Sequence, residues 1–172
     1  MKKIVSIALI GMVVFLPLEG HAASKSVSVN VSVTIPPLFE IEVGGPAGGN
    51  IEFGVVNKDP NGAVTADSPE VVITTRTNLQ QAYQVTQKLV TPLSNGQGDT
   101  IAPEDFTVQS VSSIEGGSAS NGGGVSTQDS SFFTSNGAGK SNTLRAIYRL
   151  KVKPEQAAGT YQSKLVYTIV TL

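Results

Sequence analysis

The sequence predicts an all-β fold: a sandwich of two antiparallel sheets with about seven to eight strands. Apolar and polar residues alternate with a period of two through most of the chain, and no segment of helical length has apolar residues at spacings of three and four. Clusters of Pro, Gly, Asn and Asp separate the alternating segments. Short strands divided by such turn residues are typical of a two-sheet sandwich.

The chain begins with a segment typical of a secretory signal. Lys2 and Lys3 precede an apolar run from Ile4 to Leu16, and small residues follow at Gly20 and Ala22. A run of about thirteen apolar residues is too short to span a bilayer, which needs roughly twenty. We therefore expect residues 1–22 to be removed by cleavage after Ala22. The mature protein would then have no membrane span and would be exported to the periplasm or the cell surface.

The mature chain, residues 23–172, is long enough for a single domain with its own core. It has 10 Lys plus Arg against 12 Asp plus Glu, and this net charge of −2 does not favour nucleic acid or an anionic membrane. The chain has no cysteine, and its one histidine, His21, lies in the leader. The residues of a His- or Cys-based catalytic triad or a zinc site are therefore missing, and we expect neither an enzyme nor a cofactor.

The first mature segment, Ser26 to Ile35, has the most regular alternation in the chain. A branched aliphatic residue occupies every second position: Val27, Val29, Val31, Val33 and Ile35. Fully buried, five such side chains contribute roughly 7 to 15 kcal/mol as an upper estimate, which rivals the stability of a whole domain. Pro36-Pro37 then serves either as a bend between two strands of one domain or as the end of a strand that pairs with another molecule.

The same alternation places the remaining strands and their inward faces. Strands are expected at Leu38 to Val43, Ile51 to Val56, Glu70 to Thr77, Ala82 to Val90, Phe106 to Ser112, Asn142 to Lys153 and Thr160 to Leu172. The inward set is Phe39, Ile41, Ile51, Phe53, Val55, Val71, Ile73, Tyr83, Val85, Leu89, Phe106, Val108, Leu144, Tyr148, Leu150, Val152, Tyr161, Leu165, Tyr167 and Ile169.

A row of basic residues faces away from this core on the strand that begins at Asn142. Its members Arg145, Arg149 and Lys151 form a candidate ligand face for an anionic glycan. The simpler interpretation is a solvated face whose charges discourage aggregation between sheet edges.

The segment from Ile114 to Asn142 is predicted to be a long loop. Seven of its 29 residues are glycine and seven are serine, and Phe132-Phe133 interrupts them. Loops of this length in a compact domain are usually functional or disordered. We expect a mobile surface loop whose two phenylalanines fold onto the core; the alternative is a binding loop that uses them as its apolar contact.

Two short patterns suggest catalysis or nucleotide binding, and each has a simpler interpretation. Glu40 and Glu42 share one face of a strand, as a catalytic carboxylate pair would, but this is also the solvent face of an amphipathic strand. Gly139-Lys140-Ser141 matches the end of a phosphate-binding loop, but the first glycine of that pattern is Thr134 here. We assign no catalytic or nucleotide site to either.

A third pattern has the spacing of a calcium loop. Asn57, Asp59 and Asn61 present oxygen atoms at alternate positions before Gly62. The twelfth position, where such a loop has a bidentate glutamate, is Ser68. Turn formation accounts for the same residues without an ion, so no metal site is assigned.

The two ends of the mature chain resemble a known family. The start from Ser24 to Pro36, followed by Leu38 to Val43 and a Gly-rich turn, resembles the subunits of alternate chaperone-usher colonisation fimbriae. The other end, Ala158-Gly159-Thr160-Tyr161 followed by an alternating strand, resembles their closing segment. The absence of cysteine is also common in that family. The resemblance covers the first twenty or so and the last thirty or so mature residues.

This resemblance implies an incomplete immunoglobulin-like domain whose groove receives the N-terminal extension of the next subunit. Residues 23–35 would be the donor strand, and its valines and Ile35 the inserted side chains. Implied partners are neighbouring copies or related subunits and a periplasmic assembly chaperone. We thus expect a structural or adhesive subunit of a surface fibre; the alternative is a self-contained secreted sandwich that binds a glycan or cell-wall polymer.

Overall fold

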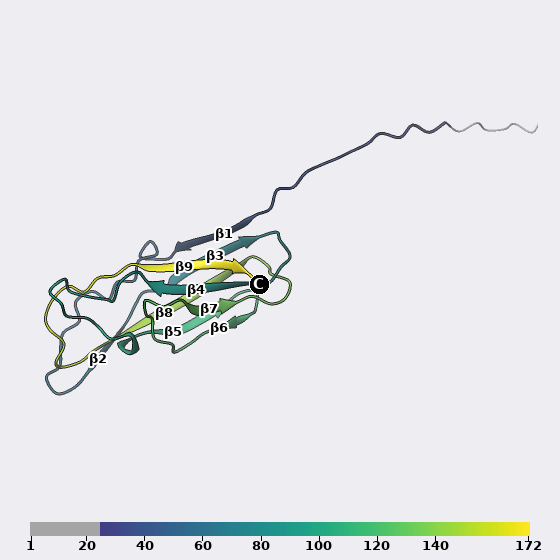
Figure 1. Cartoon of the computed structure of the whole chain (residues 1–172). Coiled ribbons are helices and arrows are strands. Elements are labelled where there is room, and N and C mark those ends of the chain that lie inside the picture. The colour runs from purple at the N-terminus through teal and green to yellow at the C-terminus, as the bar shows by residue number, and fades with distance from the viewer. Residues whose placement is uncertain (1–24) are drawn as a thin grey trace, which may run out of the picture. The chain divides into compact units, whose positions relative to one another are not determined.

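The computed structural model describes residues 25–172, and the strands of this part form two antiparallel sheets (Figure 1). The chain divides into two units, residues 1–34 and residues 35–172. The second unit contains the strands β1 (Phe39–Gly44), β2 (Val64–Asp67), β3 (Val71–Thr77), β4 (Tyr83–Leu89), β5 (Phe106–Ser113), β6 (Ser118–Ala119), β7 (Ser130–Thr134), β8 (Asn142–Val152) and β9 (Leu165–Thr171). The predicted two-sheet β-sandwich is confirmed.

The first sheet is built around β8, its longest strand. β3 and then β2 pair with successive parts of β8 on one side, and β5 pairs with it on the other. Ala146 therefore lies between Val71 and Val111. β1 pairs with β3 and forms the outer edge, with Phe39 opposite Thr77.

The second sheet has the strand order β6-β7-β4-β9. β4 is a central strand, and its alternate residues Tyr83 and Val85 are fully buried. The core lies between the two sheets, as the alternation predicts; its completely buried aliphatic and aromatic residues include Val71, Ile73, Phe132, Phe133, Leu144 and Tyr148.

The predicted strand from Ile51 to Val56 is wrong, because no strand forms there. Gly54 has a φ of 63°, a left-handed conformation that breaks the extended alternation. Ile51 and Phe53, before this glycine, still pack against the core. Val55, after it, is 89% exposed and does not belong to the inward set.

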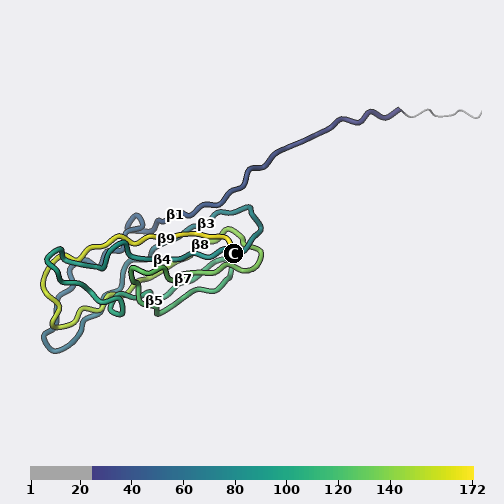
Figure 2. Tube along the Cα trace, viewed as in Figure 1, coloured from purple at the N-terminus to yellow at the C-terminus, as the bar shows by residue number. Residues whose placement is uncertain are grey.

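The Gly/Ser-rich segment from residue 114 to residue 142 is not the single loop that the sequence predicts. It contains β6 and β7, and the expectation that Phe132 and Phe133 reach the core is confirmed. Glycine permits backbones to approach closely here: a Cβ atom on Gly124 would lie 2.7 Å from the carbonyl oxygen of Pro103. Figure 2 shows the segment running along one side of the domain, beside β5.

We expect Gly139→Ala to destabilise the domain strongly. Gly139 has a φ of 57°, and a Cβ atom there would overlap the carbonyl oxygen of Gln81. The left-handed conformation alone costs about 1 to 2 kcal/mol, and the overlap adds to this. Gly137→Ala is the matched control, because nothing lies within 4 Å of the position that its Cβ atom would take. Urea unfolding of both variants measures the effect, and equal losses of unfolding free energy would contradict this explanation.

Candidate interaction site at the open side of the sandwich

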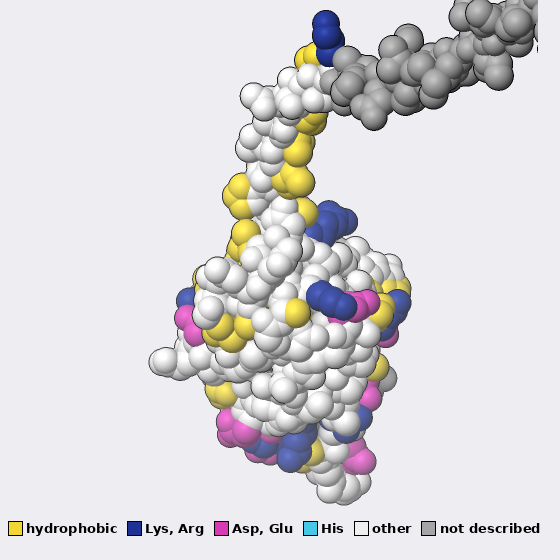
Figure 3. Space-filling view, turned by 90° about the vertical axis from the view of Figure 1, so that its right-hand side faces the viewer, with side chains coloured by type: hydrophobic (Ala, Val, Ile, Leu, Met, Phe, Trp, Pro, Cys, Tyr) yellow, Lys and Arg dark blue, Asp and Glu magenta, His cyan; other side chains and the backbone are white. Residues whose placement is uncertain are grey.

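The N-terminal segment presents its aliphatic row to solvent. The strand that the alternation predicts from Ser26 to Ile35 does not form in this single chain, because none of residues 25–38 belongs to a strand. Val27, Val29, Val31, Val33 and Ile35 are 89%, 80%, 92%, 83% and 75% exposed. Figure 3 shows hydrophobic side chains following one another along this segment. A row of five exposed branched aliphatic residues is unusual for a folded surface, and it makes this segment a candidate site of interaction.

One side of the domain ends in two unpaired strand edges. β1 pairs only with β3, and β9 pairs only with β4, among the residues that the structure describes. The two strands belong to different sheets and lie next to each other at this side, which we call the open side (Figure 1). Unpaired edges expose backbone N–H and C=O groups that can accept a further strand.

The inward residues of both edge strands are only partly buried. On β1 these are Phe39 and Ile41, and on β9 they are Leu165, Tyr167 and Ile169. Equivalent positions on the central strand β4 are fully buried. The edge residues therefore pack against the core and keep part of their apolar surface exposed, and burial of that surface by a further strand would be favourable.

The opposite side of the sandwich is closed by the chain itself. Residues 122–125 run beside the outer edge of β5 and bond to it at both ends of the contact. Gly122 N–H donates to Val108 C=O at 2.7 Å, Val108 N–H donates to Gly123 C=O at 3.0 Å, and Val125 N–H donates to Phe106 C=O at 2.8 Å. The Gly/Ser-rich segment thus pairs with the outer edge of β5, whereas the outer edges of β1 and β9 have no such partner among the described residues.

A buried polar contact joins the edge strand β9 to the other sheet. The Tyr148 hydroxyl on β8 donates to Gln87 Oε1 at 2.7 Å and lies 2.5 Å from the Tyr167 hydroxyl on β9. Because Tyr148 gives its one proton to Gln87, Tyr167 donates to Tyr148. Burial raises the pKa of Tyr148 well above its ordinary value and raises the pKa of Tyr167 to about 12. Both hydroxyls therefore stay protonated at neutral pH.

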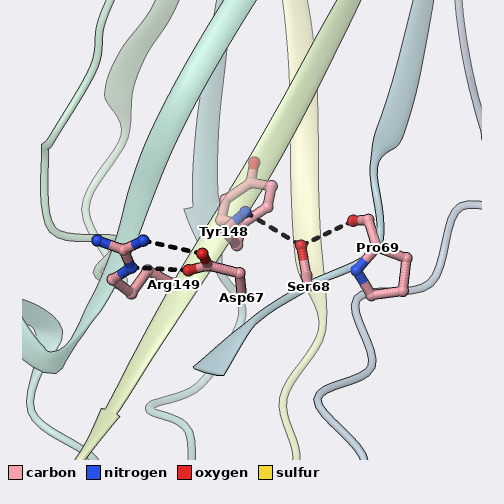
Figure 4. Close-up of polar contacts among 5 residues, drawn as sticks. All are labelled: Asp67, Ser68, Pro69, Tyr148 and Arg149. Carbon is pink, nitrogen blue, oxygen red and sulfur yellow. Dashed lines mark hydrogen bonds and ion pairs between the residues drawn. The ribbon is translucent and has the colours of Figure 1, made fainter. Parts of the chain in front are cut away.

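The basic row does not form a free cationic surface. Arg149 makes two hydrogen bonds to Asp67, at 2.7 and 2.8 Å (Figure 4), and this contact lowers the pKa of the Asp67 carboxyl. Arg145 pairs with Glu70. Lys151, the third member, is exposed. Two of the three candidate ligand-binding residues are therefore neutralised by carboxylates of the neighbouring β2 and β3 region.

Asp67 and Glu70 flank a break between β2 and β3, which the sequence pattern did not predict. Pro69 has no N–H group, and β2 and β3 are separated at this point. Ser68 repairs the ladder: its N–H donates to Tyr148 C=O at 2.8 Å, and its hydroxyl accepts from Tyr148 N–H at 3.0 Å while donating to Pro69 C=O (Figure 4). The serine before this proline is the signal that marks the break.

The short patterns that suggested catalysis have structural roles. Glu40 and Glu42 both lie near the guanidinium group of Arg76, and all three side chains are more than half exposed. Lys140 C=O accepts from the Tyr83 hydroxyl, and Ser141 Oγ accepts from Thr77 N–H, so this segment joins strands instead of opening a helix.

The calcium-like pattern forms a turn. Asp59 Oδ1 accepts from Asn61 N–H at 2.8 Å. In the part of the chain that the structure describes, no group of three or more His, Cys, Asp or Glu side chains is placed to hold a metal ion.

Comparison of the chain with protein-family models and with curated proteins gives no match. Within residues 25–172, no helix is long and apolar enough to cross a membrane.

The Tyr148–Tyr167 contact predicts a loss of stability at alkaline pH. The pKa of Tyr167 in the folded protein, about 12, lies above its ordinary value of 10.0, so folding favours the protonated form. Stability is full below pH 10 and falls as the pH rises toward 12, by about 1.4 kcal/mol per pH unit for each such tyrosine. Urea unfolding over this range measures the slope. Tyr167→Phe should reduce it, and an unchanged slope in that variant would contradict the assignment.

Proposed function

We propose that the protein is an exported subunit of a surface fibre that polymerises by strand addition. Residues 25–35 of one copy enter the open side of another and lie between β1 and β9. One observation carries this proposal: the chain has one exposed alternating aliphatic row and one side of the sandwich with two unpaired, partly apolar edges. The role of an assembly chaperone in this scheme is to cover the same open side until a second copy replaces it.

The dimensions and energies of the two parts are compatible. Nine residues from Val27 to Ile35 extend over about 30 Å as a strand, and the seven residues of β9 extend over about 23 Å. All five aliphatic side chains are at least 75% exposed in the single chain, so most of their surface remains available for burial. Their burial contributes up to roughly 7 to 15 kcal/mol, which is of the same order as the roughly 4 to 15 kcal/mol that association costs, so the contact also depends on backbone hydrogen bonds to the two edges.

An alternating strand has one face for the core and one for solvent, and the inserted segment would use its two faces in this way. The aliphatic side chains point into the acceptor, and Ser28, Asn30, Ser32 and Thr34 point outward. Charge should therefore be tolerated on one face and excluded from the other, because burial of an unpaired carboxylate costs several kcal/mol.

We expect Val29→Asp combined with Val33→Asp to abolish polymerisation of the chain that begins at Ala23. Ser28→Asp combined with Ser32→Asp is the matched control, since it adds the same charge to the opposite face of the same segment. The measurement is a gel ladder of polymers that collapses to monomer on heating, together with light scattering. The valine variant should remain monomeric while the serine variant assembles as the parent does. A parent chain that is monomeric at every concentration would exclude the proposal, as would two variants that behave alike.

A further inference from the structure

A cluster of hydrogen bonds fixes the three residues that connect the aliphatic row to β1. Pro36 and Pro37 have no backbone N–H, so Leu38 supplies the only donor of this junction. That N–H donates to Asn78 Oδ1 at 2.7 Å, Asn78 Nδ2 donates to Pro36 C=O at 2.9 Å, and Asn78 N–H donates to Leu38 C=O at 3.2 Å. One asparagine thereby binds the junction at both ends.

The asparagine side chain continues a ladder that the prolines would otherwise end. Backbone pairing between β1 and β3 stops at Phe39 and Thr77, and Asn78 is the next residue after β3. An amide group is needed at this position because it must accept from Leu38 N–H and also donate to Pro36 C=O. A carboxylate could only accept.

The prolines restrict the junction independently of Asn78. Ile35 and Pro36 each precede a proline, which disfavours the helical region of backbone space and favours an extended conformation. A type I turn requires the helical region at its first central residue, and a type II turn requires a positive φ at its second central residue, which proline cannot adopt. Residues 35 and 36 therefore resist the conformation that a reversal of the chain would require.

This restriction bears on which molecule receives the aliphatic row. β1 begins at Phe39, directly after the junction, and its arrow leads away from that end of the sandwich (Figure 1). For the row to lie along the outer edge of its own β1, the chain would have to reverse within residues 36–38. A reversal earlier in the chain would remove Ile35 and Val33 from the inserted row.

We propose that Pro36, Pro37 and Asn78 form a junction that prevents self-insertion, so that the open side is reserved for the aliphatic row of a second copy. The inference rests on the proposed function, because it assumes that the open side accepts this row. Asn78 is a positioning residue in this scheme: it touches neither the inserted row nor the edge that accepts it, and it acts through the conformation of the connecting residues.

The test releases the junction in the chain that begins at Ala23, through Pro36→Gly, Pro37→Gly and Asn78→Ala together. Each protein is refolded at high dilution, and amide hydrogen exchange is measured for residues 25–35. We expect rapid exchange in the parent. In the released variant we expect protection that does not depend on concentration, with loss of the polymer ladder at high concentration. Adding Val29→Asp and Val33→Asp to the released variant should remove the protection.

Ser141→Ala is the matched control for damage to this end of β3. The Ser141 hydroxyl accepts from Thr77 N–H and donates to Thr77 C=O without contacting the junction. Its loss should leave the row unprotected at dilution and the ladder intact. If the triple variant does not fold, Asn78→Asp alone keeps the acceptor for Leu38 N–H and removes the donor to Pro36 C=O; it should show partial protection and a shorter ladder.

The outcomes separate this inference from the function on which it rests. Rapid exchange of residues 25–35 in the released variant, or in Asn78→Asp if only that variant folds, with an undiminished ladder, would overturn the inference and leave polymerisation standing. Protection of residues 25–35 in the dilute parent would also overturn it, because the row would then insert into its own domain. Failure of the parent to polymerise at any concentration would remove the proposed function itself.

Discussion

The whole arrangement depends on an imbalance in how the sandwich covers its edges. Each sheet has two outer edges. On one side the Gly/Ser-rich segment covers the edge of β5 and supplies the short edge strand β6. At the other side β1 and β9 keep unpaired backbone groups and partly exposed apolar residues. An unprotected pair of edges promotes uncontrolled association, and natural proteins usually cover or charge such edges. Here the chain also carries an alternating aliphatic row, and we propose that this row is the specific partner of the edges.

Residues 114–142 are as rich in glycine and serine as a flexible linker, but in this domain they form ordered structure at the closed side. Phe132 and Phe133 hold the segment in the core, and Gly117 and Gly124 lie where a side chain would collide with Phe133 or Pro103. Glycine is used for close approach as well as for conformational freedom. The segment adds two short strands and a covering stretch to the domain, which lets the closed side be built without a further long strand.

Sequence alternation predicts the long strands well and the open side not at all. β3, β4 and β8 each bury one face completely or nearly so, which is the condition under which a period of two is strongest. In β5 the pairing with β8 shifts between Val108 and Ser110, so the buried positions pass from Val108 to Val111. β2, β6 and β7 are too short or too rich in serine to show that period. Gly54 ends the alternation after Phe53 in a way that only its backbone angle reveals. Which strands become edges depends on pairing between distant segments, and no local pattern contains that information.

Because the chain has no cysteine, the position of the aliphatic row can be tested directly with introduced cysteines. Two populations of the chain are prepared, and each carries a single cysteine. One isotopically labelled population would carry a cysteine in place of Ser28, Asn30, Ser32 or Thr34, and an unlabelled population would carry Thr168→Cys on the exposed face of β9. Neighbouring strands bring such residues to about 4.5 to 5.5 Å between Cα atoms, within the range for a disulfide. We predict that oxidation of the mixed assembly joins one labelled to one unlabelled chain at a single preferred position. Failure of all four positions to form this mixed disulfide in assembled material would contradict strand addition at the open side.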